Sequence, residues 1–263
     1  MSLATDSNQK SIKVYINNEL CMAKRVDITD MGLPYAFVNP CAVVYEDELH
    51  VIGGSYHYKW DGTQWDSVST PPTGNGCAVV FDGEIHYFIG TAHYGWDGTE
   101  WNTYTLPNSM SVVDCVVFGN DMHIFGATSH YKWDGTDWVS VSTLPVSLSS
   151  GRVVVYDNKF NLLCQGHYEW DGTDWSVAST IPAVFDDAVV MNDIYLIGCG
   201  NDKDQSYIWD GTEWTEDKQL FIPLINGKAV IYNNAIYCIG GKGYFKMCIK
   251  YGSDIAIGSI NIT

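Results

Sequence analysis

Short hydrophobic runs separated by tight-turn signals dominate this chain, and residues 77–107 show the pattern clearly. CAVVF is an apolar run, DGE carries an Asp-Gly turn, and IHYFIG alternates as a second strand. AHYGW and WNTYTLP then flank a DGTE turn, and a proline ends the last strand. Nothing in the chain shows a sustained helical period. The pattern predicts an antiparallel meander of four strands of about five residues each.

The same unit recurs along the chain. Five near-identical hexapeptides of the form WDGTxW contain all ten tryptophans and begin at Trp60, Trp96, Trp133, Trp170 and Trp209. The intervals between these starts are 36, 37, 37 and 39 residues, a period typical of solenoids and propellers. The Asp-Gly-Thr turn should place the two tryptophans of each copy side by side across a hairpin. Stacking such sheets around an axis covers their apolar faces, which favours a β-propeller.

The number of blades can be counted from the strand that would line the central channel. Six candidates share a short apolar pattern: CAVVY at Cys41, CAVVF at Cys77, CVVF at Cys115, VVVY at Val153, AVVM at Ala188 and AVIY at Ala229. This predicts an all-β, six-bladed propeller of four-stranded antiparallel blades. The last unit lacks WDGTxW, whereas YINNEL at residues 15–20 fits that slot. We therefore expect residues 11–30 to pair with the C-terminal blade and close the ring, with a partial seventh blade as the alternative.

Composition narrows the classes of function. The chain has 263 residues, and 31 acidic against 14 basic side chains give a formal charge of −17. Such a charge repels a phosphate backbone, so nucleic acid is not an expected partner. Residues 1–10 are expected to be a disordered tail or a cloning remnant, and residues 11–263 a single domain. The chain as given shows no signal peptide or membrane span, so a soluble protein without membrane contact is expected, and its localisation stays open.

Eight cysteines could suggest a disulfide framework, but they fall on the repeat. Cys41 and Cys77 open equivalent strands, and none of the eight forms a CxxC pair. A free cysteine behaves as a small buried hydrophobe, which suits these positions. We expect reduced, structural thiols and a reducing or anaerobic setting.

Two phrases carry a family resemblance. Val-Ile-Gly-Gly at residues 51–54, Cys-Ile-Gly-Gly at residues 238–241 and a downstream aromatic-Asp turn before a Trp resemble the kelch repeats of galactose-oxidase-like propellers. The HYKWDGT phrases from His57 and His130 and the VSTLP phrase from Val141 are similar to kelch-type arrays in proteins of gut Firmicutes and their phages. The chain departs from the kelch pattern in that the Gly-Gly pair is complete only in the first and last units.

Candidate binding residues fall into three groups. A mixed-charge ring at the mouth of the predicted channel holds Asp114, Arg152, Asp187 and Lys228, beside Cys41 and Cys77. A repeated histidine slot could give a weak ligand site at several blades: His57, His93, His130 and His167. The longest loop between second and third strands adds Asn201, Asp202 and Asp204. Equivalent histidines on different blades are too far apart to share one metal ion at bonds of about 2 Å, so no metal is expected.

The turns and motifs offer no catalytic set. The Asp-Gly-Thr segments do not match the sialidase Asp-box, and a tight turn explains them, because Asp-Gly suits positive φ angles. Arg25 and Arg152 are the only arginines, too few for a sialidase-type cluster, and no nucleophile elbow, HExxH or P-loop is present. No cofactor and no catalytic residue are therefore predicted.

Three functions remain open. The first is a monomeric, noncatalytic module that binds a protein through its variable loop face, in a host-associated bacterium or a phage particle. The second is a multivalent glycan-binding propeller, because Tyr58, Tyr94, Tyr131 and Tyr168 recur at blade intervals. The third is a kelch-class sugar-modifying enzyme, such as a mutarotase, that uses one or two carboxylates around the channel.

Overall fold

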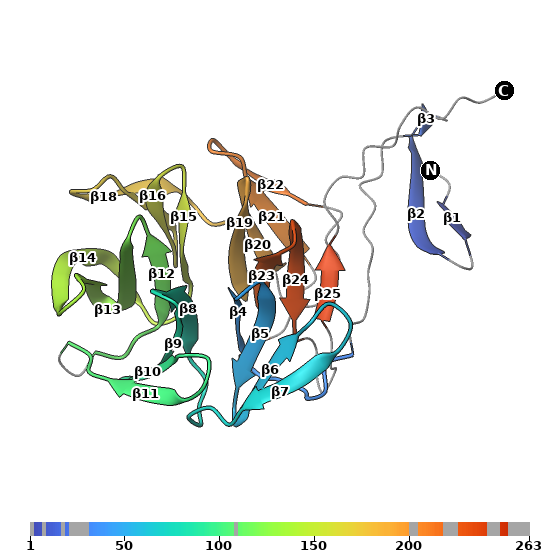
Figure 1. The fold of residues 1–263 in the computed structure, drawn as a ribbon. Helices are drawn as coiled ribbons and strands as arrows, with labels where there is room; N and C mark the ends of the chain where they lie inside the picture. The colour runs from blue at the N-terminus through green and yellow to red at the C-terminus, as the bar shows by residue number, and fades with distance from the viewer. Residues whose placement is uncertain are drawn as a thin grey trace.

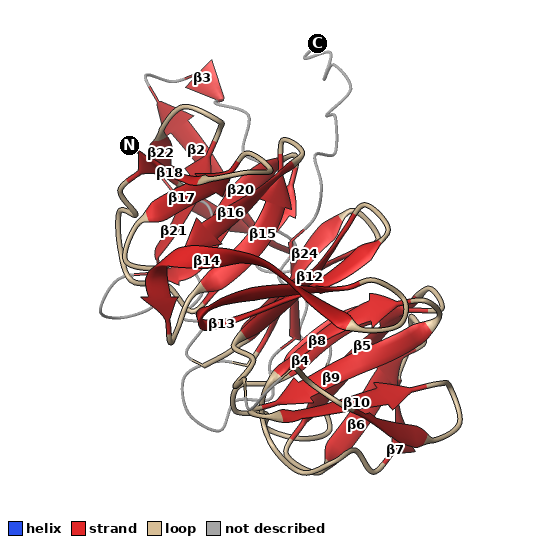
Figure 2. Ribbon diagram, turned by 90° about the vertical axis from the view of Figure 1, so that its left-hand side faces the viewer, coloured by secondary structure: helices blue, strands red, loops and turns tan. Residues whose placement is uncertain are grey.

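The architecture is all-β in the part of the chain that the structure describes. The computed structural model describes residues 3–6, 9–16, 19–20, 32–107, 110–199, 205–217, 226–240 and 248–251. Figure 2 shows strands joined by short loops throughout this part. Among the described residues no helix is long and apolar enough to cross a membrane.

The first blade shows how the repeat folds. Its strands β4 (Cys41–Tyr45), β5 (Glu48–Gly53), β6 (Tyr56–Trp60) and β7 (Trp65–Ser69) pair in chain order, each antiparallel to the next. Trp60 lies opposite Trp65, as the hexapeptide predicts. The two rings are 5.4 Å apart, within the range of a favourable aromatic pair.

The same plan repeats along the chain. The second blade has β8 (Cys77–Phe81), β9 (Glu84–Ile89), β10 (Ala92–Trp96) and β11 (Trp101–Tyr104). The third has β12 (Asp114–Phe118), β13 (Asp121–Trp133) and β14 (Trp138–Leu148). The fourth has β15 (Arg152–Tyr156), β16 (Lys159–Leu163), β17 (His167–Trp170) and β18 (Trp175–Ser179). The fifth has β19 (Asp187–Met191), β20 (Asp193–Cys199), β21 (Gln205–Trp209) and β22 (Trp214–Glu216).

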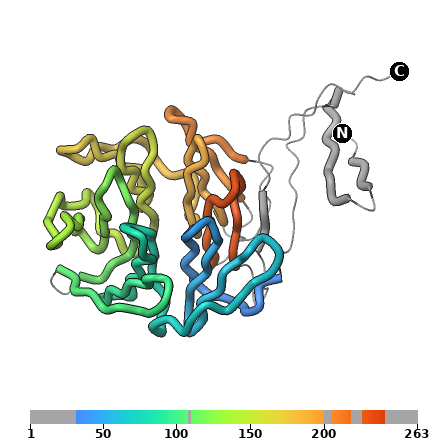
Figure 3. The backbone as a smooth tube through the Cα atoms, viewed as in Figure 1, coloured from blue at the N-terminus to red at the C-terminus, as the bar shows by residue number. Residues whose placement is uncertain are grey.

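A shorter sheet follows the fifth blade. It consists of β23 (Lys228–Tyr232), β24 (Ala235–Ile239) and β25 (Cys248–Tyr251), and we call it the closing sheet. Strand β23 contacts both β19 and β4, so this sheet lies between the fifth and first blades. Figure 3 shows the blue start of the propeller beside its orange-red end, and Figure 1 shows the inner strands gathered in the middle.

The expected six, or alternatively seven, four-stranded blades are wrong. The structure has five blades that carry a WDGTxW hairpin, and within the described residues the closing sheet has three strands instead of four. Its sequence lacks the hexapeptide, and therefore the hairpin that forms the outer half of each of the five blades. In the third blade, β13 runs continuously through positions that form separate second and third strands elsewhere.

The expected ring closure by the N-terminal segment is also wrong. Strands β1 (Leu3–Asp6), β2 (Gln9–Ile16) and β3 (Glu19–Leu20) form their own sheet and do not pair with the closing sheet. Tyr15 pairs with Leu20 across a hairpin of the same register as Trp60 with Trp65, so the slot match reflects a local hairpin. Residues 17–18 and 21–30 of the predicted closing segment lie outside the described residues.

The core lies between neighbouring blades. At the first boundary, Val43 and Tyr45 of the first blade pack against Ile85, Tyr87 and Trp96 of the second. Six cysteines are free and buried, as predicted: Cys41, Cys77, Cys115, Cys164, Cys199 and Cys238. Apolar area removed from water between blades stabilises the fold at roughly 25 cal/mol per Å².

Candidate functional site

The propeller has two unlike faces. We call the face that holds the WDGTxW turns the hairpin face, and the opposite one, where the inner strands begin, the variable face. On the hairpin face, Asp61 Oδ1 accepts hydrogen bonds from the backbone N–H groups of Thr63 at 2.7 Å and Gln64 at 2.8 Å. Gly62 adopts a φ of 100°, as the turn chemistry predicts.

These turns are structural in all five copies. The aspartates accept equivalent backbone hydrogen bonds, which lower their carboxyl pKa values; that of Asp97 falls to about 2. A carboxylate whose oxygens already accept backbone N–H groups holds its own turn. The hairpin face therefore repeats the same hydrogen-bonded turn in each of the five blades.

The six inner strands begin on the variable face, where the sequence predicts the mouth of the central channel. We define the channel mouth as the first residues of the inner strands: Cys41, Cys77, Asp114, Arg152, Asp187 and Lys228. Asp187 is fully buried and pairs with two cations, Arg152 through Nε and Lys228 through Nζ at 3.2 Å. Its other oxygen accepts the backbone N–H of Ala229 at 2.6 Å. The structure thus brings together three of the four charged residues expected here.

The fourth, Asp114, lies in the same ring. It is buried, and its Oδ2 accepts the backbone N–H of Val153 at 2.6 Å. This bond crosses the boundary between the third and fourth blades. Asp187 makes the corresponding bond between the fifth blade and the closing sheet. Burial raises the pKa of Asp114 even though Lys228 and Arg152 act against that shift. For Asp187, burial would raise the pKa, but Lys228 and Arg152 outweigh it and lower the pKa. The two carboxyl groups therefore differ in their electrostatic environment.

Local backbone geometry places the Arg152 guanidinium. Gly151 precedes it with a φ of 121°, and a Cβ there would lie 2.3 Å from the carbonyl oxygen of Leu163. Only glycine, which has no Cβ, allows the backbone at position 151 to pass this close to Leu163 at the start of β15. Arg152 Nη1 then donates to Gly151 O at 2.7 Å, and Nη2 donates to Asp186 O at 3.2 Å. These bonds fix the guanidinium, whose side chain keeps 23% of its surface exposed.

The other side of the channel mouth carries thiols. Cys41 Sγ donates to Gly76 O at 2.9 Å, and burial, together with the charge of Cys77, raises the pKa of Cys41 to about 12. A thiol with so high a pKa is a poor nucleophile. Among the described residues, no group of three or more His, Cys, Asp or Glu side chains could hold a metal ion.

The repeated histidines lie away from the channel mouth. His57, His93, His130 and His167 are buried between the blades, so a ligand at the surface does not reach their rings. Three of them pair with a second histidine on the preceding strand, at 2.8–2.9 Å. In the fourth blade Asn161 takes the partner's place, at 2.7 Å from His167. Burial lowers the pKa of His57, His93 and His130 to about 3 and that of His167 to about 4.

The structure reveals an aromatic group that sequence reasoning missed. Tyr35 and Tyr56 lie on the variable face of the first blade, with ring centroids 4.0 Å apart and 39% and 38% of their surfaces exposed. Tyr58, one of the four tyrosines in the glycan hypothesis, is partly buried beneath them. A signal was present, because Tyr56 breaks the repeat where the other blades carry Ala92, Ser129, Gly166 and Gln205. Asn201, Asp202 and Asp204 lie outside the described residues.

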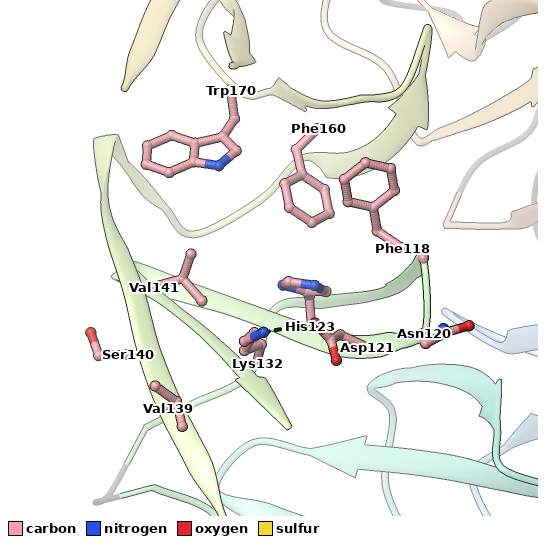
Figure 4. A pocket seen from close by; sticks show the side chains of 11 residues that line it. Phe118, Asn120, Asp121, His123, Lys132, Val139, Ser140, Val141, Phe160 and Trp170 are labelled. Carbon is pink, nitrogen blue, oxygen red and sulfur yellow. Dashed lines mark hydrogen bonds and ion pairs between the residues drawn. The ribbon is translucent and has the colours of Figure 1, made fainter. Parts of the chain in front are cut away.

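A cleft of about 500 Å³ separates the third and fourth blades (Figure 4). Phe118, Phe160 and Trp170 line its apolar part, and Lys132 pairs with Asp121 at 2.8 Å at its edge. The same strand positions carry Glu48 with Lys59 in the first blade, and Lys159 with Glu169 in the fourth. This ion pair is therefore part of the repeat, which gives it a structural role.

Comparisons with known proteins identify the fold. No family model matches the chain, and no curated protein matches it. Among solved structures it is similar to YjhT, with a TM-score of 0.69 and 14% identity over 83% of this chain and 94% of that one. It is also similar to the extracellular domain of BT4673 from B. thetaiotaomicron, with a TM-score of 0.55 and 10% identity over 86% of this chain and 40% of that one. These likenesses show a β-propeller fold, and the kelch assignment stays a prediction.

Proposed function

We propose that this protein is a noncatalytic binding module whose channel mouth holds an acidic segment of a protein partner. The observation that carries the proposal is the arrangement of Arg152 and Lys228 on either side of the buried carboxylate of Asp187. Two cations share one anion, and both keep part of their side chains exposed, 23% for Arg152 and 17% for Lys228. In the proposed complex, a carboxylate of the partner contacts both cations while Asp187 stays in place.

The surrounding charge adds specificity. The chain carries a formal charge of −17, so the two cations are a local exception on an acidic protein. Charge repulsion from the rest of the surface disfavours non-specific contact with acidic partners, whereas a segment that reaches the channel mouth finds two fixed donors. The rigid strands beneath these residues favour binding, because little ordering is needed when the ligand arrives.

The geometry favours binding over turnover. Both carboxylates of the channel mouth are buried, and each accepts a backbone N–H across a blade boundary. Asp187 is committed to two cations as well. A sugar-modifying enzyme needs an acid or base within hydrogen-bond reach of its substrate, and these bonds direct the carboxylate oxygens into the protein.

The test is a selection of random peptides on the purified protein. We expect selected peptides to carry Asp or Glu, to bind less tightly as salt is raised, and to lose about tenfold in affinity to Lys228→Met. Lys132→Met, which removes an exposed lysine far from the channel mouth, should leave their affinity unchanged. Peptides without acidic residues, or an equal affinity for Lys228→Met, would overturn the proposal.

A further inference from the structure

The first blade carries an exposed pair of tyrosines, Tyr35 and Tyr56, at positions where the repeat does not require an aromatic ring. Tyr56 opens β6, and the equivalent positions of the other four blades hold small or polar residues. All of those blades fold with the same strand order, so the ring at position 56 is not required for a blade to form. Tyr35 lies in the connection that leads into the first inner strand, and its ring packs on that of Tyr56.

The platform formed by Tyr35 and Tyr56 is fixed from below. Leu33 and Phe37, on either side of Tyr35, are buried in the core cluster between the first blade and the closing sheet. Phe37 packs edge-on to Tyr35 at 5.4 Å, and it passes so close to Gly53 that a Cβ there would lie 3.2 Å from its ring. Asn39 donates its backbone N–H to Asn226 O at 2.8 Å, which ties the segment to the closing sheet. The tyrosines are therefore presented on an ordered segment, at low entropic cost for a ligand.

Polar groups lie next to Tyr56 in the chain and on the segment that is bridged to it through Gly54 and Gly74. Ser55 Oγ and Thr73 Oγ1 are 3.4 Å apart, and Asn75 Oδ1 accepts the backbone N–H of Gly54 at 3.3 Å. Both contacts are exposed to solvent. Neutral hydroxyls and an amide beside flat aromatic rings match a ligand that has an apolar face and a rim of hydroxyl groups.

We infer that Tyr35 and Tyr56 form a carbohydrate-binding platform for a neutral pyranose ring. The axial C–H groups of such a ring pack on the exposed outer side of the tyrosine pair, and its hydroxyls exchange hydrogen bonds with Ser55, Thr73 and Asn75. A neutral sugar suits the site because the described contacts of the platform involve no charged side chain. This site is separate from the channel mouth and does not depend on the function proposed for it.

The experiment is saturation-transfer NMR with a panel of neutral methyl pyranosides and their oligosaccharides. We expect saturable binding of at least one sugar, with transfer strongest to protons on one ring face. Tyr56→Ser, which installs the residue that the third blade carries in this slot, should weaken binding about three- to tenfold. Tyr56→Phe and Tyr35→Phe should retain it, because they keep the rings. Tyr104→Ser, which removes a comparably exposed tyrosine from the second blade, is the matched control and should bind as the wild type does.

Two results would overturn the inference. One is the absence of saturable binding across the panel; the other is equal binding by Tyr56→Ser and the wild type. If the first result is found together with a protein partner that Tyr56→Ser loses, the platform is a protein contact. Lys228→Met should leave sugar binding unchanged, so failure at the channel mouth and failure at the platform can be told apart.

Discussion

The indole of Trp175 on the fourth blade donates a hydrogen bond to Ser142 Oγ on the third blade, at 3.0 Å. Trp101 donates to Ser69 in the same way, at 3.0 Å, between the second and first blades. Each serine lies within 3.0 Å of Nδ1 of a buried histidine, His130 or His57. Because the indole N–H can only donate, the serine hydroxyl is the acceptor in each tryptophan–serine hydrogen bond. The tryptophans of the repeat therefore join neighbouring blades.

Ser142→Ala should destabilise the protein by about 1–3 kcal/mol, because it leaves the part-buried N–H of Trp175 and Nδ1 of the buried His130 without their partner. Ser179 supplies the matched control. It occupies the same place in the fourth blade but donates to Thr180 O, and the nearby His167 Nδ1 and Trp214 Nε1 have no partner among the described residues. Ser179→Ala should therefore change the free energy of unfolding by less than about 0.5 kcal/mol. Urea unfolding of both variants measures the difference, and equal losses would contradict this role of Ser142.

Removing the carboxylate at the centre of the channel mouth should be costly. Asp187→Asn leaves Arg152 and Lys228 in a partly buried site without their shared anion, and we expect a loss of about 3–5 kcal/mol in the free energy of unfolding. Asp121→Asn removes one partner of an ion pair whose side chains are both 37% exposed, and should cost no more than about 1 kcal/mol. Calorimetric melting of the two variants makes the comparison. A loss for Asp187→Asn as small as that for Asp121→Asn would mean that the stability of the channel mouth does not depend on the charge of Asp187.

Acid should destabilise the fold through its histidines before the carboxylates titrate. Burial lowers the pKa of His50 and His123 to about 4 and of His57, His93 and His130 to about 3, whereas an unfolded histidine titrates near 6.5. The unfolded chain therefore binds more protons, and the free energy of unfolding should fall as the pH drops from about 6.5 towards 4. Above about pH 6.5 these histidines are neutral in both the folded and the unfolded chain, so they no longer make the free energy of unfolding depend on pH.

His123→Asn isolates this effect, because Asn161 already accepts from a histidine in the equivalent place of the fourth blade. The variant has one fewer buried histidine to protonate, so the slope of its stability between about pH 6.5 and 4 should be smaller than that of the wild type. Urea midpoints measured across this window test it. An unchanged slope would show that His123 does not titrate in the unfolding reaction.

The tight turns of the hairpin face should tolerate a side-chain change at their variable position but not an added Cβ at the glycine. Gly62 has a φ of 100°, and a Cβ added there would meet no heavy atom within 4 Å, so Gly62→Ala adds backbone strain without a clash. We expect a loss of about 1–2 kcal/mol in the free energy of unfolding. Gln64→Ala, at the variable position of the same turn, should be close to neutral. Thermal melts of the pair give the answer, and a neutral Gly62→Ala would contradict the strain argument.

Local pattern was enough to predict the blade. The inner strand beginning at Cys41 and the hairpin that pairs Trp60 with Trp65 are both as predicted, because alternation and turn chemistry act over a few residues. The predicted pairing of residues 11–30 with the last blade failed for the opposite reason. A hairpin signature such as that of Tyr15 to Leu20 specifies its own register but carries no information on which distant edge it meets.

The arrangement of the channel mouth was predicted only in part. Equivalent repeat positions correctly placed Asp114, Arg152, Asp187 and Lys228 in one ring, because first residues of inner strands converge by symmetry. The pairing of Arg152 and Lys228 with one carboxylate depends on side-chain direction, which spacing does not give. The platform of Tyr35 and Tyr56 joins a connection to a strand of the same blade, and no repeat relates these two positions.

The most direct test of the central claim is an amide NMR titration of the labelled protein with a selected acidic peptide. The backbone N–H groups of Ala229 and Val153 donate to Asp187 and Asp114, so they report on the channel mouth. We expect these two amides to shift saturably, while Thr63 and Thr99 in the hairpin turns stay in place. Shifts confined to the hairpin face, with Ala229 and Val153 unmoved, would contradict binding at the channel mouth.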